Sequence, residues 1–277
     1  MAVGVAVALT LATAPAASAM AGAAETRSGR PVRGLDISAY QHAGPPINWR
    51  VLARHGIRFV AIKVTEGTYY TNPYYRSDAR AAAKAGLAIL PYVFANPSRS
   101  GGAATARFAV RAARYRRGFE LPLVVDLEND PYAGSDCYRL GTRRMVAWIA
   151  GFIARATVLT GRRPVIYTTD AWWRECTRST GRFRADPLWL AAYDTGWPAV
   201  PSPWRRWAFW QYNDNGFLSG IGQTDLDYYQ PVNGLSSLRS APRHKKVLPK
   251  KHHKPKKHHK PKSRKRPRPK PRRKHSK

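Results

Sequence analysis

Short apolar runs alternate with longer amphipathic stretches between residues 33 and 168. The runs are rich in β-branched residues, and the stretches between them are rich in alanine and arginine at helical spacing. This pattern predicts strands at residues 34–37, 59–64, 88–94, 123–127 and 165–168. The helices predicted between them span residues 49–55, 74–85, 103–116 and 139–160. Such alternation favours repeated β/α units around a parallel sheet.

The pattern changes after the fifth strand. Residues 188–193, 208–212 and 224–228 have strand character, but there is no room for full helices between them. The sequence therefore predicts an α/β fold, a modified TIM-like barrel with five β/α units followed by three strands that lack full helices. Barrels of this kind run to about 200–250 residues as a single domain. We expect one catalytic domain at residues 33–238.

The N-terminus has the pattern of an export signal. An uncharged apolar run at residues 1–11 is followed by small residues and by an A-x-A match at Ala17-Ser18-Ala19. We expect a signal peptide at residues 1–19, a linker at residues 20–32 and a secreted protein, extracellular or associated with the cell wall. A weak N-terminal anchor is the alternative, although the run is short for a membrane span of ~20 residues. No stable membrane insertion is expected after removal of the signal.

The C-terminus has a different composition. The formal net charge is 48 − 16 = +32, and 20 of the 48 basic residues lie at residues 239–277, which contain no acid. A segment rich in Lys, Arg, His and Pro predicts a disordered tail. Such a tail would attract anionic wall polymers, or DNA, in a salt-sensitive manner. Metal binding by its histidines and a merely solubilising role are further alternatives.

Two cysteines, Cys137 and Cys176, are the only ones in the chain. An even number of cysteines in an exported protein favours a disulfide between them over two free thiols.

Carboxylates recur where the predicted strands end. Functional groups of barrels gather at the carboxyl ends of the strands, so these acids are candidates for the site. The acids in such positions are Asp36, Glu66, Asp126, Glu128, Asp225 and Asp227.

Asp126 and Glu128 are two residues apart on one strand, so their side chains leave from the same face. Two carboxylates on either side of a glycosidic bond can hydrolyse it, one as proton donor and one as the anion that supports the positive transition state. The alternative is that these acids only neutralise a basic domain or cap the following helix.

Other chemistries have little support. Only His42 and His55 precede the tail, too few for a histidine-built zinc site, and no phosphate-binding glycine loop follows a strand. We therefore expect no cofactor and no metal. Aromatic residues are abundant near the predicted strand ends, and sugar rings pack on such surfaces. We expect about half of them to be core. The candidates for substrate contact are Tyr92, Tyr167, Tyr193 and Trp210, together with Glu66 and Asp225.

Six segments, taken in order, resemble glycoside hydrolase family 25, the muramidases or lysozymes. They are Gly34-Leu-Asp36-Ile-Ser, Ile62-Lys-Val-Thr-Glu66-Gly67, Val125-Asp126-Leu-Glu128, Val165-Ile-Tyr167-Thr, Phe209-Trp-Gln-Tyr212 and Asp225-Leu-Asp227. The resemblance covers residues 33 to about 233. It departs from the family pattern at Val93, where many relatives have histidine, and at Ala39-Tyr40, which replaces a common His-Trp pair.

The resemblance implies a barrel of five β/α units followed by three strands. It also implies cleavage of the β-1,4 bond between N-acetylmuramic acid and N-acetylglucosamine in peptidoglycan. Glu128 would be the proton donor, and Asp126 would orient the 2-acetamido group or stabilise positive charge. Asp36 and Asp227 would support the sugar ring and tune the acid. Cys137 and Cys176 lie where some bacterial relatives have a disulfide.

Two other functions fit parts of the sequence. A chitinase-like hydrolase of β-1,4-N-acetylhexosaminides also uses closely spaced carboxylates. A non-catalytic wall-binding or polyanion-binding protein would explain the basic tail but not the full set of acids.

Overall fold

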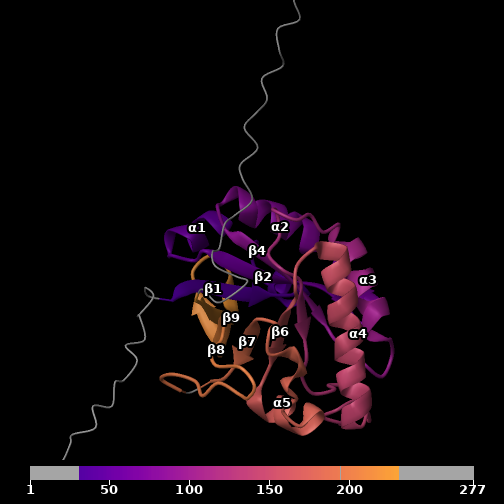
Figure 1. Cartoon of the computed structure of the whole chain (residues 1–277). Helices are drawn as coiled ribbons and strands as arrows, with labels where there is room; N and C mark the ends of the chain where they lie inside the picture. The colour runs from indigo at the N-terminus through magenta and orange to yellow at the C-terminus, as the bar shows by residue number, and fades with distance from the viewer. Residues whose placement is uncertain (1–30, 194, 231–277) are drawn as a thin grey trace, which may run out of the picture. The chain divides into compact units, whose positions relative to one another are not determined.

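The computed structural model describes residues 31–193 and 195–230, which contain a closed eight-stranded barrel (Figure 1). The predicted signal peptide, most of the linker, the end of the predicted domain and the tail lie outside the described residues. No helix within the described ranges is long and apolar enough to cross a membrane.

Seven strands of the barrel run in the same direction, and each is parallel to the next of the seven. They are β1 (Val32–Ile37), β2 (Phe59–Glu66), β4 (Ala88–Phe94), β5 (Val124–Asp126), β6 (Val165–Thr168), β7 (Leu188–Ala191) and β8 (Phe209–Leu218). Pairing of β1 with β2 at one edge and with β9 (Gly222–Tyr229) at the other closes the barrel. A short strand, β3 (Tyr70–Thr71), pairs with the end of β2.

The last strand, β9, runs antiparallel to both of its neighbours. The predicted barrel is confirmed, and so is the parallel sheet predicted for its β/α units; no direction was predicted for this last strand. The physical reason for its antiparallel direction is the connection. Only a tight turn separates β8 from β9, and a parallel pair would need a crossover of a dozen or more residues.

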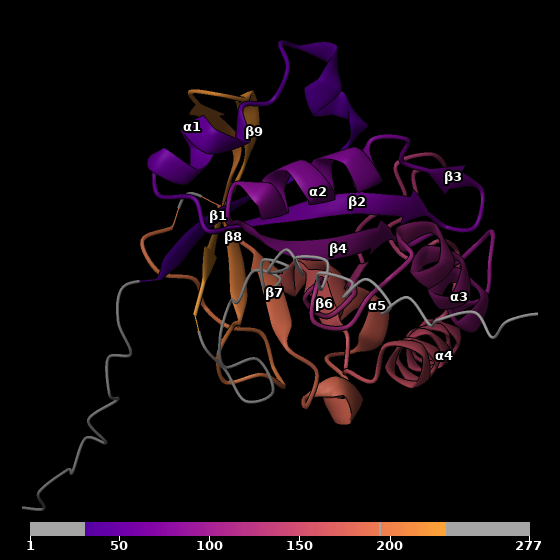
Figure 2. The same ribbon diagram turned by 90° about the horizontal axis from the view of Figure 1, so that it is seen from above.

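Helices follow each of the first five barrel strands. They are α1 (Trp49–Arg54), α2 (Tyr75–Lys84), α3 (Gly102–Ala113), α4 (Thr142–Thr160) and α5 (Asp170–Thr177), with short 3-10 turns η1 (Ala39–Ala43) and η2 (Gly181–Phe183). In both views α3 and α4 lie side by side, and α2 lies against β2 and β4 (Figure 2). The five predicted β/α units are confirmed.

The helices differ from the prediction in one helix that was missed and in their ends, such as that of α3, which ends at Ala113 and not at residue 116. The eight-residue α5 was not predicted. It begins where the Thr169 hydroxyl accepts a hydrogen bond from the backbone N–H of Trp172, at 3.1 Å. The helix predicted from residue 139 begins only at Thr142, because Tyr138 and Arg139 have positive φ angles of 56° and 55° that interrupt a helix.

Alternation along the strands divides the core into an inner and an outer face. The lower barrel interior is apolar, and Phe59, Phe209 and Tyr229 pack there edge to face or tilted. Gly34 makes room for this layer, since a Cβ at that position would lie 2.2 Å from the Phe59 ring. Outward-facing residues pack under the helices. The same alternation turns the acids near the carboxyl ends of the strands inward.

Candidate active site

Five predicted acids meet at the carboxyl end of the parallel strands. Asp36 is the penultimate residue of β1, Asp126 ends β5, and Glu128 follows two residues later. Asp225 on β9 pairs with Asp36, and Asp227 pairs with Gly34. The side chains of Asp36, Asp126 and Asp227 are buried, whereas those of Glu128 and Asp225 are half-buried. Their charges act on one another, as the raised pKa values below show.

Asp126 and Glu128 form one coupled pair. Burial is the main cause that raises the pKa of Asp126 well above 3.8, and the negative charge of Glu128 raises it further. Burial also raises the pKa of Glu128, against the opposing effects of a hydrogen bond from Asp126 and of the positive charge of Lys63. Asp126 Oδ1 has no hydrogen-bond donor among the described residues. Because each of the two carboxyl groups acts on the pKa of the other, they titrate together as a pair.

Asp36 on β1 and Asp227 on β9 form a second carboxyl pair. Asp227 Oδ1 accepts a hydrogen bond from Trp189 Nε1 at 2.9 Å, and Oδ2 has no donor in the described part of the chain. Burial, and then the charge of Asp36, raises the pKa of Asp227 well above 3.8. Burial also raises the pKa of Asp36 to about 6, although hydrogen bonds from Gln211 and Asp227 oppose it. Burial and the charge of Asp36 therefore favour the protonated, neutral form of Asp227.

Asp225 is a further member of this group of acids, and its pKa is also raised. Burial raises its pKa to about 8, and the neighbouring charges of Asp36, Asp214 and Glu128 add to the effect. Because these carboxyl groups lie close together in a largely buried site, they cannot all be ionised at once. The site therefore holds protons at a pH where isolated carboxyl groups have lost theirs.

Gln211 on β8 connects the acids to two tyrosines. Its Nε2 donates to Asp36 Oδ2 at 2.7 Å and more weakly to Asp225 Oδ2 at 3.4 Å. Its Oε1 accepts from the hydroxyls of Tyr167 at 2.8 Å and Tyr193 at 2.5 Å. Gln211 was not predicted from the sequence as a site residue. The available signal was a polar residue inside an apolar run, in phase with the inward-facing positions of its strand.

Glu66, at the end of β2, belongs to a separate polar group beside the acid pair. Lys63 Nζ lies 2.8 Å from Glu66 Oε2, and the hydroxyls of Tyr69 and Tyr132 both donate to Oε1. Burial raises the pKa of Glu66, but these three partners outweigh burial, so that the net pKa is lowered. The Lys63 charge also acts on Asp126 and Glu128, and Lys63 too was missed from the sequence.

The predicted aromatic contacts divide into two groups. Tyr92 and Tyr167 are buried in the upper barrel interior, each edge to face with Trp189, and Tyr193 is partly exposed at the rim. The structure does not bring Trp210 to the acids. Strand alternation turns it outward, where it is 4% exposed and packs against Trp207 and Tyr228.

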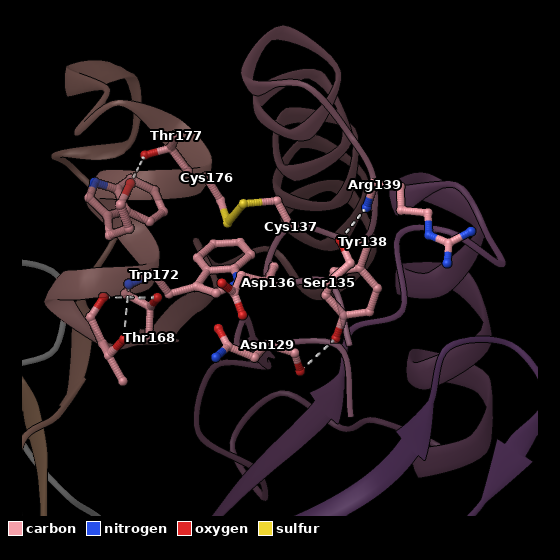
Figure 3. The surroundings of a disulfide bond; sticks show 12 residues. Asn129, Ser135, Asp136, Cys137, Tyr138, Arg139, Thr168, Trp172, Cys176 and Thr177 are labelled. Atoms are coloured by element: carbon pink, nitrogen blue, oxygen red, sulfur yellow. Dashed lines mark hydrogen bonds between the residues drawn. A yellow bond between two sulfur atoms is a disulfide. The ribbon is translucent and has the colours of Figure 1, made fainter. Parts of the chain in front are cut away.

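A disulfide anchors the loop that carries Glu128 and Tyr132. Cys137 and Cys176 are bonded, with Cα atoms 5.4 Å apart, so the predicted disulfide is confirmed (Figure 3). It fastens the loop to α5, where Trp172 Nε1 donates to the carbonyl of Asp136 at 2.8 Å. On the other side of the loop, the Tyr138 hydroxyl donates to the carbonyl of Ala95 at 3.0 Å. The loop is therefore held from two directions.

No group of three or more His, Cys, Asp or Glu side chains in the described ranges is arranged to hold a metal ion. Paired buried carboxyl groups of raised pKa, lined by tyrosines, are suited to donating a proton and supporting a developing positive charge. A barrel with such a site at its carboxyl end has the character of a glycoside hydrolase.

Comparison with known proteins points to the same class. A profile described as "Glycosyl hydrolases family 25" matches residues 35–221. Lysozyme M1 of Streptomyces globisporus is 38% identical over 202 residues, which cover 72% of this chain and 67% of that protein. The N,O-diacetylmuramidase of a Chalaropsis species is 37% identical over 205 residues, covering 68% and 94%.

Solved structures agree with the sequence matches. The bacterial lysozyme of Streptomyces coelicolor superposes with a TM-score of 0.68 at 36% identity, covering 73% of this chain and 93% of that one. A family GH25 lysozyme from Aspergillus fumigatus has a TM-score of 0.66 at 36% identity, with coverages of 76% and 100%. The chain belongs to glycosyl hydrolase family 25. It is a glycoside hydrolase of the lysozyme class.

Proposed function

We propose that this chain is a secreted N-acetylmuramidase, which hydrolyses the β-1,4 bond between N-acetylmuramic acid and N-acetylglucosamine in peptidoglycan. Membership of family 25 supports this substrate, as do the names of the relatives, a lysozyme and a diacetylmuramidase. The observation that carries the mechanism is the coupled carboxyl pair of Asp126 and Glu128 at the end of β5.

Glu128 is the proton donor in this proposal. It is the less buried member of the pair, so it can reach the glycosidic oxygen, and its raised pKa favours the protonated form that a proton donor needs. When the proton is on Glu128, Asp126 is the anion of the pair. It then orients the 2-acetamido group or stabilises the positive charge that develops on the sugar.

The other acids and the tyrosines would hold the sugar. Asp36 and Asp227 would support the ring and tune the acid, since Asp36 and Glu128 interact electrostatically. Tyr92, Tyr167 and Tyr193 supply apolar surface and hydroxyl groups, and Tyr167 and Tyr193 are fixed by hydrogen bonds to Gln211.

Export and wall targeting complete the proposal. Residues 1–19 would direct secretion, and the catalytic domain would extend over residues 33–238. The basic tail at residues 239–277 would bind anionic wall polymers. Deleting residues 240–277 should weaken sedimentation with intact walls, most visibly at low salt, and leave the hydrolysis of short soluble glycans nearly unchanged. Equal sedimentation of both proteins would contradict wall targeting by the tail.

Identification of the new reducing end tests the proposed activity. Purified walls are digested, the reducing ends are converted to sugar alcohols with borohydride, and the products are analysed by mass. Muramic acid at the new ends is the expected result. Glucosamine at those ends would contradict it, and preferential hydrolysis of chitin oligomers would favour the chitinase-like alternative.

A further inference from the structure

Three exposed tyrosines surround one side of the barrel mouth. Tyr40, Tyr69 and Tyr132 follow β1, β2 and β5, and their exposed fractions are 85%, 44% and 62%. Large aromatic side chains exposed at neighbouring strand ends provide a surface for a ligand. Two of them, Tyr69 and Tyr132, are oriented by their hydrogen bonds to Glu66.

An arginine from a fourth loop lies on this aromatic surface. Arg99 follows β4, and its guanidinium carbon is 5.1 Å from the centre of the Tyr69 ring and 6.0 Å from that of Tyr132. Stacking on aromatic faces orients a guanidinium group while leaving its N–H donors available. We define Arg99, Tyr69 and Tyr132 as the arginine platform.

The charge of Arg99 is not neutralised by a carboxylate in the described part of the chain. None of the four ion pairs there includes Arg99. Glu66, which binds both tyrosines of the platform, is paired with Lys63. Asp130 in the adjacent loop accepts the backbone N–H groups of Tyr132 and Ala133 instead. The platform therefore presents a positive, planar group with unused donors to solvent.

The platform adjoins the proposed proton donor. The charge of Glu66 raises the pKa of Glu128, and Lys63 acts on both of these acids. A sugar held at Glu128 would thus have its substituents close to the tyrosines. In peptidoglycan the muramic acid carries a peptide stem with free carboxyl groups. A stem of four residues reaches at most about 13–14 Å when extended, a length suited to crossing from the sugar to the barrel rim.

We infer that the arginine platform binds a carboxylate of this peptide stem through Arg99, and so makes the enzyme prefer glycan strands that carry stems. Arginine is suited to this role because its fork of N–H donors matches a carboxylate in two parallel hydrogen bonds. The inference rests on the proposed muramidase activity. It assigns recognition of the stem to residues that take no part in bond cleavage.

Three matched substrates test the inference. They are soluble glycan oligomers with intact stems, the same oligomers after an amidase has removed the stems, and oligomers whose stem carboxyl groups are converted to amides. The proteins compared are the wild type, Arg99→Gln, Arg99→Lys and the control Arg107→Gln. Arg107 is an exposed arginine on α3, so its substitution removes the same charge away from the rim.

Arg99→Gln should lower kcat/KM on stem-bearing oligomers by about three- to fivefold, the range expected for an exposed charge pair. It should change kcat/KM on the stem-free and amidated oligomers less than twofold, because the charge pair is absent there. The wild type should lose the same factor when the carboxyl groups are amidated, as a double-mutant cycle requires. Arg99→Lys should keep part of the preference, and Arg107→Gln should keep all of it.

Two results would overturn the inference. An equal loss on all three substrates would mean that Arg99 supports the site or contacts the sugar or its lactyl group, and no loss on any would mean that it contacts nothing. Thermal unfolding of each variant shows whether a loss comes from misfolding, and a folded Arg99→Lys that recovers the preference excludes that cause. Failure of the wild type to cleave any of the oligomers would refute the proposed function itself, a result distinct from both.

Discussion

Removing the disulfide should lower the free energy of unfolding of the catalytic domain substantially. The perturbation is the double substitution Cys137→Ala and Cys176→Ala. The bond joins residues 39 positions apart in the sequence. Without it the unfolded chain gains the entropy of an open loop of this length, whereas the folded loop keeps its other anchors at Trp172 and Tyr138.

The size of the effect follows from the loop length. In the chain-entropy description, closing a loop of this length stabilises the folded state by about 4 kcal/mol at 25 °C. The loop carries Tyr132, so its loosening should also reduce activity on stem-bearing glycans. Because the total stability of a domain is ~5–15 kcal/mol, losing the disulfide would leave the folded state only marginally stable.

Urea denaturation at neutral pH measures the loss, with the reduced wild type as a control that leaves both side chains in place. Both proteins should lose a similar amount of stability, and the denaturant slope should rise because the unfolded chain without the bond exposes more surface. A loss of stability below ~1 kcal/mol in both the double variant and the reduced wild type would refute the reasoning. It would show that other contacts keep the loop closed in the unfolded chain when the bond is absent.

Three further predictions concern the barrel interior. Gln211→Leu should lower kcat about tenfold or more with less change in KM, because Asp36 loses its donor; an unchanged kcat on soluble glycan would contradict this. The free energy of unfolding should fall as pH rises from about 4 to about 8, because folding raises the pKa of Asp36 to about 6 and that of Asp225 to about 8. Asp225→Asn should make the free energy of unfolding, measured by urea titration, depend less on pH. A free energy of unfolding that rises over this pH range would disprove the raised pKa values of Asp36 and Asp225. Gly34→Ala should cost about 1–3 kcal/mol by crowding the ring of Phe59, measured by thermal unfolding; an unchanged midpoint would count against close packing there.

Much of the barrel could be predicted because its strands have a strong local signal. Apolar runs such as β2 and β4 are buried on both faces, and the helices between them repeat at a regular spacing. The direction of β9 could not be predicted from its own residues, since direction depends on the turn that joins it to β8. The helix α5 has only eight residues, and its two tryptophans are buried in the core. Its sequence is therefore too short and too apolar to show a clear helical pattern.

The acids of the site were predictable because carboxylates rarely occur in apolar strands without a reason. Gln211 and Lys63 were missed, as an isolated amide or amine gives a weaker signal than paired acids. Trp210 was assigned to the substrate because it is an aromatic residue near a predicted strand end, and Gln211 follows it in the sequence. Neighbouring residues on a strand face opposite sides, so only one of the two can face the acids, and that one is Gln211.

The most direct test of the central claim is the rate of hydrolysis by Glu128→Gln on soluble peptidoglycan glycans, measured by the release of muramic acid reducing ends. The glutamine cannot donate the proton, so the rate should fall by about a hundredfold or more while the protein remains folded and retains glycan binding. Asp126→Asn, measured alongside, should lose nearly as much because it removes the anion of the pair. Near-wild-type hydrolysis by folded Glu128→Gln would contradict the assignment of Glu128 as the proton donor.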